Sequence, residues 1–307
     1  MPVEIPIGVD SCEVKCGTKR LSLTNLQKIF WPELGKTKRD LLAYYAGISD
    51  TLLPHLVRRA MVMKRYPNGI AGKFFFMKRT PEYKPEWLET CSIEHKSGNI
   101  IDFPIAHDVA SLLWIVNLGC IDLNPWYSQC DDVNRPDVLH FDLDPVPPAD
   151  FGEVRKSALL VKAYLDERHV SSYPKTSGSR GIHIYVPIVR GPLQKEVWTV
   201  AKGTAIELAK QHPNVITSEY KIAKRPSGLV LVDYNQNAWG RTLASVYSVR
   251  PRPEATVSAP VTWDEVENGV SIADFTIDSV PLRVAKLGDL FKPVLQKRGR
   301  CRLETLE

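Results

Sequence analysis

Apolar residues recur at two different spacings along the chain, and each spacing predicts a different kind of element. Two short runs alternate apolar and polar residues around Gly17, which predicts a β-hairpin over residues 12–24. After Thr37 the apolar spacing becomes helical, and Asp40 stands where an acid completes a helix N-cap, so a helix is predicted over about 38–53. Similar spacing predicts further helices over about 107–118, 151–169 and 193–211.

Strand-like apolar runs alternate with these helices. They occupy Val138–Leu143, Gly181–Val186 and Leu229–Tyr234. The chain has 307 residues, enough for two ordinary domains or one large bilobed one, and it shows no internal repeat, low-complexity tract or long linker. We therefore expect an α+β protein with two lobes in one unit. Its expected divisions are a leader, a main domain and a basic, mobile tail, over residues 1–11, 12–295 and 296–307.

Composition and charge narrow the class of protein. The chain is 44% hydrophobic and 24% charged, as in ordinary soluble globular proteins, and no stretch approaches the roughly 20 apolar residues of a membrane span. The N-terminus carries acids and lacks the basic-then-apolar pattern of a signal peptide, so we expect a cytoplasmic protein without a membrane partner. The net charge of +5 is compatible with a phosphate-rich partner but does not identify one.

The cysteines do not form a metal-binding pattern. Only Cys12 and Cys16 lie close together, whereas a zinc site needs about four ligands and no second pair is present. We therefore expect ordinary reduced thiols at all six positions, namely Cys12, Cys16, Cys91, Cys120, Cys130 and Cys301.

Two carboxylates share one face of a predicted strand. Alternation places His140, Asp142 and Asp144 on one side, opposite the apolar residues between them. Like charges this close are costly when desolvated unless a cation neutralises them, and oxygen ligands favour magnesium or manganese. An acidic strand end that is simply exposed to water would show the same spacing. This pair alone therefore does not distinguish a metal site from a solvated strand end.

A third acid, Asp233, ends the apolar run Leu229–Val232 as Asp144 ends its own run. Three acids at strand ends suit two metal ions, which would lower the pKa of an attacking 3′-hydroxyl and stabilise charge on phosphorus. This favours nucleotidyl transfer. An aspartyl-phosphate phosphatase would instead have a small turn residue and a threonine after its acids, where Pro145 and Val146 stand here.

A loop of small, hydroxylic and basic residues, Thr176–Gly181, precedes the predicted strand over 181–186. Exposed backbone N–H groups beside Arg180 could cradle a triphosphate, although a hairpin turn of the same composition needs no ligand. His183 faces away from its apolar neighbours, as a ligand or as a hydrogen-bonded structural histidine. The polar run Tyr234–Asn237 after Asp233 is costly to bury without partners.

Three of these motifs, in this order, resemble the polymerase domain of bacterial ligase D. They are Asp142–Pro145, Ser177–His183 and Val232–Asn237. The likeness spans about residues 12–295 and implies a primase-polymerase fold of the archaeo-eukaryotic primase superfamily, with central, mostly antiparallel sheets flanked by helices. It also implies a template-dependent polymerase that serves non-homologous end joining and often prefers manganese and ribonucleotides.

The resemblance assigns roles to residues that match the family's motifs. It implies that two ions, Mn²⁺ or Mg²⁺, are held by Asp142, Asp144 and Asp233. It implies that the incoming NTP or dNTP is bound by Ser177, Arg180, His183, Gln236 and Arg250. Two positions depart from the family pattern, because Arg180 replaces a common lysine and Asn124 a common histidine.

DNA contacts follow from the same resemblance. The downstream 5′-phosphate is expected at Asn25, Lys28 and Lys38, and Lys38 stands at a predicted helix N-terminus, where backbone donors and the helix dipole favour an anion. Phe75 and Phe76 are expected to stack near template bases. Alternation along the Phe74–Phe76 run prevents all three rings from facing inward on a strand.

The implied partners are DNA with 5′-phosphorylated ends or gaps, nucleoside triphosphates, a Ku-type end-binding protein and a DNA ligase, at the nucleoid. One alternative is a primase-polymerase for short-gap excision repair or primer synthesis. Another is a non-catalytic DNA-end binding module, which would need Lys28 and Lys38 but none of the three acids. The sequence has no ligase-type lysine motif, so we expect a stand-alone polymerase or an excised domain.

Overall fold

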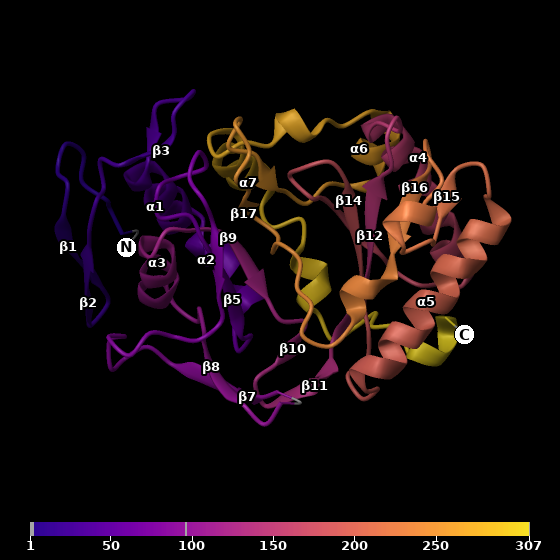
Figure 1. Ribbon diagram of the computed structural model, residues 1–307, viewed down its shortest axis with the longest axis horizontal. Coiled ribbons are helices and arrows are strands. Elements are labelled where there is room, and N and C mark those ends of the chain that lie inside the picture. Colours follow the sequence, from indigo (N-terminus) through magenta and orange to yellow (C-terminus); the bar gives the residue numbers. More distant parts are fainter. Residues whose placement is uncertain (1–2, 96, 307) are drawn as a thin grey trace. The chain divides into compact units, whose positions relative to one another are not determined.

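The computed structural model describes residues 3–95 and 97–306, so the first two residues of the predicted leader lie outside it. The chain divides into two compact units, each assembled from separate segments (Figure 1). Unit 1 comprises Met1–Asp131, Ala244–Val257 and Phe275–Asp289. Unit 2 comprises Asp132–Leu243, Ser258–Asp274 and Leu290–Glu307. Within the described residues, no helix has the length and apolar character needed to cross a membrane.

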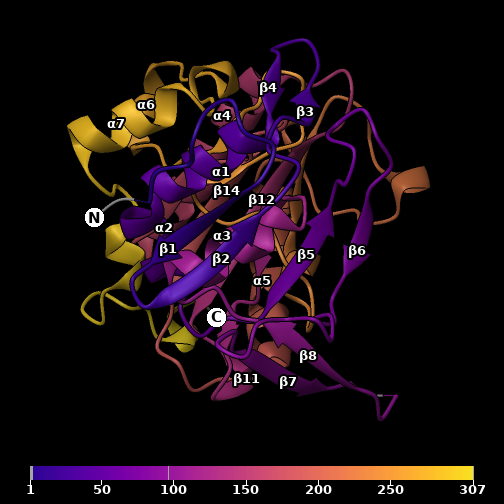
Figure 2. The same cartoon turned by 90° about the vertical axis from the view of Figure 1, so that its left-hand side faces the viewer.

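Unit 1 begins with the predicted hairpin, whose strands are β1 (Cys12–Cys16) and β2 (Lys19–Leu23). Strand β2 packs against helix α3 (Val109–Asn117), which confirms the helix predicted there (Figure 2). The main sheet of this unit is antiparallel, in the order β6 (Phe75–Met77), β5 (Met61–Arg65), β9 (Cys120–Pro125). Its other elements are β3 (Ile29–Trp31), β4 (Lys36–Thr37), β7 (Thr90–Glu94), β8 (Ile100–Pro104), β10 (Ser128–Gln129), β17 (Ser248–Val249) and α7 (Ser279–Leu287).

The helix predicted over 38–53 begins where expected but is broken into two, α1 (Lys38–Gly47) and α2 (Ser49–Leu56). At its start the Thr37 side chain accepts a hydrogen bond from the Asp40 N–H, and the Asp40 carboxylate accepts one from the Thr37 N–H. The break follows Gly47, which has low helix propensity, and the Ser49 hydroxyl donates to the Ala46 carbonyl. Local hydrogen bonding therefore competes with one continuous helix.

Unit 2 is built on a five-stranded sheet in the order β13 (Tyr173–Thr176), β14 (Ile182–Pro187), β12 (Val138–Pro145), β16 (Val230–Asp233), β15 (Ile216–Thr217). All neighbours are antiparallel except β15 and β16. Helices α4 (Phe151–Glu167) and α5 (Gln194–Gln211) pack against β12. The predicted strands, helices and mostly antiparallel α+β class are thus confirmed. The remaining elements are β11 (Asp132–Pro136), η1 (Ile222–Lys224), η2 (Tyr234–Asn237), α6 (Trp263–Asn268), η3 (Ile272–Asp274), η4 (Lys292–Leu295) and η5 (Leu303–Leu306), and β18 (Val257–Ser258) crosses the unit boundary.

Strand β12 is central in this sheet, and both of its faces are covered. The apolar side chains Leu139, Phe141 and Leu143 are completely buried. On the alternate face His140 is also completely buried, and Asp142 is only 6% exposed. Polar groups enclosed in this way need hydrogen bonds or compensating charges.

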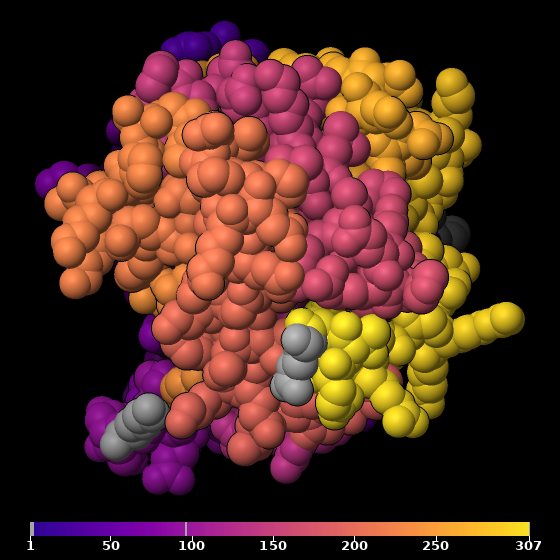
Figure 3. All heavy atoms as spheres, turned by 90° about the vertical axis from the view of Figure 1, so that its right-hand side faces the viewer, coloured from indigo at the N-terminus to yellow at the C-terminus, as the bar shows by residue number. Residues whose placement is uncertain are grey.

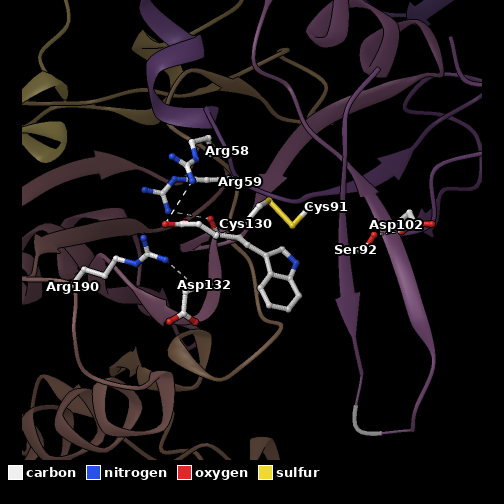
Figure 4. The surroundings of a disulfide bond; sticks show 10 residues. Arg58, Arg59, Cys91, Ser92, Asp102, Cys130, Asp132 and Arg190 are labelled. Carbon is white, nitrogen blue, oxygen red and sulfur yellow. Dashed lines mark hydrogen bonds and ion pairs between the residues drawn. A yellow bond between two sulfur atoms is a disulfide. The ribbon is translucent and has the colours of Figure 1, made fainter. Parts of the chain in front are cut away.

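The expectation that all six cysteines are reduced thiols is wrong for two of them. Cys91 on β7 and Cys130, 39 positions later, form a disulfide with their Cα atoms 5.8 Å apart (Figure 4). The Cys130 N–H donates to the carbonyl of Arg58, and Arg59 donates to the Tyr127 carbonyl, which holds this segment in place. Sequence spacing could not reveal the pair, because tertiary contacts bring the two positions together. The free cysteines of the described residues are Cys12, Cys16, Cys120 and Cys301.

The expectation of a mobile C-terminal tail is also wrong for its described part. Arg300 donates to the carbonyls of Asp137 and Ile188, and Leu303 and Leu306 are buried. Element η5, which carries these leucines, packs against α5 (Figure 3, yellow against salmon). The prediction of mobility rested on the basic residues of this segment. Burial of the two leucines that follow stabilises the segment against the protein in spite of that charge.

Candidate active site and phosphate pocket

Three acids at the ends of β12 and β16 interact electrostatically, because their charges affect one another's pKa. Asp142 lies directly opposite Asp233 in the antiparallel register, and Asp144 follows on the same face of β12. Burial raises the pKa of Asp144 to about 7, with further contributions from Asp142 and Asp233, while Arg180 and Arg225 act in the opposite direction. Burial and Asp142 also raise the pKa of Asp233. Each carboxylate therefore makes ionisation of its neighbours more costly.

The polar run after β16 orients Asp233. One carboxylate oxygen accepts a hydrogen bond from the Asn235 N–H at 2.8 Å, and the other accepts one from Gln236 Nε2 at 3.1 Å. Asn237 instead joins η2 to β12, because it donates to the His140 carbonyl at 2.7 Å and accepts from the His140 N–H at 3.1 Å. The predicted cost of burying this run is thus offset by bonds within the protein.

The donor set of this cluster fits a divalent cation. Carboxylate oxygens are the ligands that magnesium and manganese take, and a cation between these acids would remove the repulsion that raises the pKa of Asp144. In the positions that their side chains hold here, no three His, Cys, Asp or Glu residues of the described chain form a ready metal cluster.

The loop between β13 and β14 is organised by its own serine. Ser177 Oγ accepts hydrogen bonds from the backbone N–H groups of Ser179, Arg180 and Gly181, at 3.1, 3.2 and 2.9 Å. These three amides are therefore not the open phosphate cradle that the sequence suggested; the exposed Arg180 side chain remains as the loop's cation. Gly181 is required here, since an added Cβ would lie 2.1 Å from the Leu143 carbonyl oxygen.

His183 lies deep in unit 2, beside the acids. It stands opposite Asp142 in the register of β12 and β14, is 3% exposed, and its Nε2 lies 3.3 Å from Asp142 Oδ1. Its Nδ1 lies 2.7 Å from the Nζ atom of Lys175 on β13. The structure thus places this predicted nucleotide ligand between Lys175 and Asp142; a direct nucleotide contact stays a prediction.

Arg250 and Asn124 both belong to unit 1. The Arg250 Nε atom lies 4.0 Å from Asp122 Oδ2, and Lys64 Nζ lies 3.9 Å from the same oxygen. Asn124 Nδ2 donates to the Asp122 carbonyl at 3.1 Å. Burial raises the pKa of Asp122 against the opposing effect of Arg250 and Lys64. The predicted role of Arg250 at the nucleotide stays a prediction.

The three residues predicted to bind a 5′-phosphate line one cavity of about 560 Å³ in unit 1. Asn25 has a left-handed backbone (φ 55°), Lys28 Nζ donates to Asn68 Oδ1 at 2.6 Å, and Lys38 Nζ donates to the Thr24 carbonyl at 2.6 Å. Residues from the hairpin, the following loop and the start of α1 therefore meet in one place. Arg20 and Arg65 line the same cavity and add positive charge.

The electrostatics of this cavity favour an anion. Burial, followed by the nearby charges of Lys28 and Arg65, lowers the pKa of Lys38 to about 8, with Asp10 opposing. Lys38 is also the first residue of α1, at the positive end of the helix dipole. The N–H groups of Lys38 and Arg39 already donate to the carbonyls of Lys28 and Leu26, so an anion here would be held by side chains and by the dipole. A phosphate would relieve the repulsion between these cations.

The aromatic run 74–76 faces solvent at every position. Phe74, Phe75 and Phe76 are 50%, 45% and 62% exposed. Lys64 Nζ lies 4.2 Å from the ring centroid of Phe74, and the Arg65 guanidinium lies 5.2 Å from that of Phe75. Exposed rings beside cations suit nucleic-acid bases and phosphates, and the template-stacking role of Phe75 and Phe76 stays a prediction.

Comparison with known proteins identifies the family of this chain. The model of the ligase D primase-polymerase domain matches residues 37–291. The chain belongs to this family. It is 32% identical over 278 residues to the multifunctional non-homologous end joining protein LigD of Mycolicibacterium smegmatis, covering 90% of this chain and 36% of that protein. It is 34% identical over 273 residues to the bifunctional LigD protein of Bacillus subtilis, covering 88% and 43%.

The fold agrees with this family assignment. The polymerase domain of Mycobacterium tuberculosis ligase D, solved in complex with DNA, superposes with a TM-score of 0.84 at 30% sequence identity, covering 90% of this chain and 98% of that one. The expected primase-polymerase fold is thereby confirmed. The chain spans between a third and a half of the length of the two LigD proteins above.

Three cations near these sites were missed in the sequence. Arg225 influences two of the acids from the loop before β16, Lys175 contacts His183, and Arg65 lines the phosphate cavity. Lys175 and Arg65 carried a usable signal. Lys175 stands beside Thr176 in a short strand that leads into a ligase D motif, and Arg65 begins the segment Arg65–Gly69, which resembles a ligase D segment. Nothing local distinguishes Arg225 from a solvated arginine.

Proposed function

We propose that this chain is a template-dependent nucleotidyltransferase that extends DNA ends or fills short gaps with nucleotides, ribonucleotides preferred, during double-strand break repair by non-homologous end joining. The observation that carries the proposal is the pairing of Asp142 with Asp233 across β12 and β16, with Asp144 coupled to both. Membership of the ligase D primase-polymerase family supports the same activity.

The three acids would hold two divalent ions, Mn²⁺ or Mg²⁺. Such ions, when bound, lower the pKa of the primer 3′-hydroxyl and neutralise charge that develops on the transferred phosphoryl group. Asn235 and Gln236 hold Asp233 in place, and His183 holds Asp142. Arg180 would bind the triphosphate, on a loop that Ser177 shapes, with Gln236 and Arg250 as further nucleotide ligands.

DNA would be held by unit 1. Asn25, Lys28 and Lys38 would bind the 5′-phosphate of the downstream strand in the 560 Å³ cavity, and Phe75 and Phe76 would stack on template bases. The solved ligase D polymerase domain named above is itself in complex with DNA. A Ku-type end-binding protein and a DNA ligase are proposed as partners at the nucleoid, since the relatives are named as end-joining proteins.

The test is extension of a labelled primer across a short gap with a 5′-phosphate, in manganese, with NTPs or dNTPs. Wild type should extend the primer and use NTPs at least as well as dNTPs. Asp142→Asn should abolish extension while its binding to the gapped DNA is unchanged. The matched control is Asp166→Asn, an acid on the solvent side of α4, which should extend normally.

Two other results would redirect the assignment. Extension that starts without any primer would favour the primase-polymerase alternative, which shares the same acids. Tight DNA binding with no extension by wild type would favour a non-catalytic end-binding module. The coupled acids argue against a non-catalytic end-binding module. Buried carboxylates that repel one another are energetically costly, and DNA binding alone does not require them.

A further inference from the structure

Four ionisable residues form a row across the sheet of unit 2. Lys175 on β13 stands opposite His183 on β14, His183 stands opposite Asp142 on β12, and Asp142 stands opposite Asp233 on β16. Cross-strand neighbours in adjacent strands lie side by side, so the row is continuous from a cation to the two acids. The last two members belong to the proposed metal site, and Lys175 is the far end.

Lys175 is an unusual residue to bury. Its exposed fraction is 0%, and its Nζ atom lies 2.6 Å from Ser258 Oγ and 2.7 Å from His183 Nδ1. Ser258 Oγ in turn donates to the Thr176 carbonyl at 2.7 Å, so the hydroxyl oxygen is free to accept from the lysine. Removing an ammonium from water costs several kcal/mol, roughly, before partners compensate. An apolar side chain would fill this position without that desolvation cost, so the buried lysine indicates a functional role.

A charged Lys175 would fix the proton arrangement of His183. An ammonium group has three donors and no acceptor, so the His183 nitrogen that faces it, Nδ1, must accept. A neutral imidazole that accepts at Nδ1 carries its proton on Nε2. Nε2 is the atom that lies 3.3 Å from Asp142 Oδ1, so the proton points at the carboxylate. The opposite tautomer would turn a lone pair toward a negative charge.

We propose that Lys175 is a positioning residue, which acts through the His183 ring to hold one carboxylate oxygen of Asp142 in place for metal binding. The inference rests on the proposed function only for its catalytic consequence; the lysine, the tautomer and the orientation of Asp142 are properties of the protein alone. His183 would then hold Asp142 whether or not its ring also contacts the nucleotide. Partners behind a metal ligand commonly contribute about 10–100-fold to metal affinity or activity.

The experiment compares wild type with Lys175→Met, Lys175→Gln and Ser258→Ala. Methionine keeps the length of the chain but removes the donor, glutamine keeps an N–H donor without charge, and Ser258→Ala keeps Lys175 opposite His183. Three properties are measured: the His183 tautomer by ¹⁵N-histidine NMR, the dissociation constant of Mn²⁺ alone by its EPR signal, and kcat and KM for primer extension. The His183 resonance is assigned by its loss in His183→Asn.

We expect the Nε2–H tautomer in wild type, Lys175→Gln and Ser258→Ala, and a mixture of tautomers in Lys175→Met. In Lys175→Met the Mn²⁺ dissociation constant should rise about tenfold and kcat fall about 10–100-fold, with the KM for NTP within about threefold. Lys175→Gln should recover most of both losses. The melting temperature and the binding of 5′-phosphorylated gapped DNA, which uses unit 1, report whether each variant is folded.

Two outcomes would overturn the proposal. One is an Nδ1–H tautomer in wild type, which excludes the inferred donation by Lys175. The other is a folded Lys175→Met or Lys175→Gln protein that loses activity while its tautomer and its Mn²⁺ affinity match wild type. Failure of the proposed polymerase function is distinguishable, because tautomer and Mn²⁺ affinity are measured without DNA or nucleotide.

Discussion

Asp142 and Asp233 are direct cross-strand partners in the sheet of unit 2, although they come from distant parts of the sequence. Two carboxylates in such a pair repel one another, and cross-strand like charges normally destabilise a sheet. Burial, and after it the charges of Asp142 and Asp233, raises the pKa of Asp144 to about 7. This cluster therefore destabilises the protein as long as no cation neutralises it.

Asp144→Asn should stabilise the metal-free protein and inactivate it. At pH 8, above the raised pKa of Asp144, the carboxylate is ionised beside two other acids, and the amide removes this charge. We expect the melting temperature in EDTA to rise by about 2–4 °C, the shift that ~1 kcal/mol gives at this size, and primer extension to fall at least ~10³-fold. Calorimetry and a gap-filling assay measure the two effects. The control Glu267→Gln changes an exposed acid and should alter neither, and an Asp144→Asn protein that melts below wild type would contradict the account.

Lys28→Ala combined with Lys38→Ala should remove the preference for a 5′-phosphate at a gap. Both side chains line the cavity of unit 1, and each phosphate contact contributes about 0.9 to the slope of log affinity against log salt. Fluorescence anisotropy with phosphorylated and unphosphorylated gaps, at several salt concentrations, gives the affinity ratio and the slope. Lys156→Ala, on the exposed side of α4, is the control. An unchanged ratio in the double variant would show that the phosphate binds elsewhere.

Recognition of the 5′-phosphate should weaken as pH rises through about 8. The pKa of Lys38 is lowered to that value, so the ammonium is charged below it and neutral above it, and only the charged form attracts the phosphate. We expect the affinity ratio of phosphorylated to unphosphorylated gaps to fall between pH 7 and pH 9. Lys38→Arg is the matched variant, because a guanidinium stays charged throughout this range. Its ratio should stay level, and a wild-type ratio equally level would rule out Lys38 as the titrating group.

Breaking the Cys91–Cys130 disulfide should lower the free energy of unfolding by about 2–4 kcal/mol. The bond closes a loop between residues 39 positions apart and so restricts the unfolded chain. Urea unfolding of wild type with and without a thiol reductant, and of the double serine variant, measures this difference. Reduced wild type and the variant should agree, and Cys12→Ser, at a free half-buried cysteine, should match untreated wild type. A reductant that leaves the wild-type midpoint unchanged would contradict the prediction.

Phe75→Ala with Phe76→Ala should weaken binding to a single-stranded template overhang without destabilising the fold. Both rings are exposed, and base stacking on an aromatic ring contributes about 1–3 kcal/mol per base. We expect affinity for the overhang to fall about 10–100-fold and the melting temperature to change by less than ~2 °C. Ile100→Ala, at an exposed apolar position on β8, is the control for lost surface area. Equal affinities of variant and wild type would exclude template stacking.

The amino-acid sequence alone determined the local elements and the chemistry that they carry. Capping at Thr37, alternation along β12 and helical spacing in α3, α4 and α5 are set by neighbouring residues, so these elements were predicted correctly. The acids at the ends of two apolar runs indicated a cation site for the same reason. Among the predicted elements, the helix over 38–53 was misjudged, where a glycine and a serine hydroxyl interrupt it. The main sheet of unit 1, in the order β6, β5, β9, was not predicted.

Tertiary structure decided which distant residues became partners. The register of β12, β14 and β16 joins Lys175, His183, Asp142 and Asp233 in one row, and register depends on how whole strands pack rather than on any local pattern. Packing likewise paired Cys91 with Cys130 and buried the leucines that anchor the C-terminal segment. A local pattern can show that a side chain is polar, but burial and pairing arise only when distant segments exclude water between them.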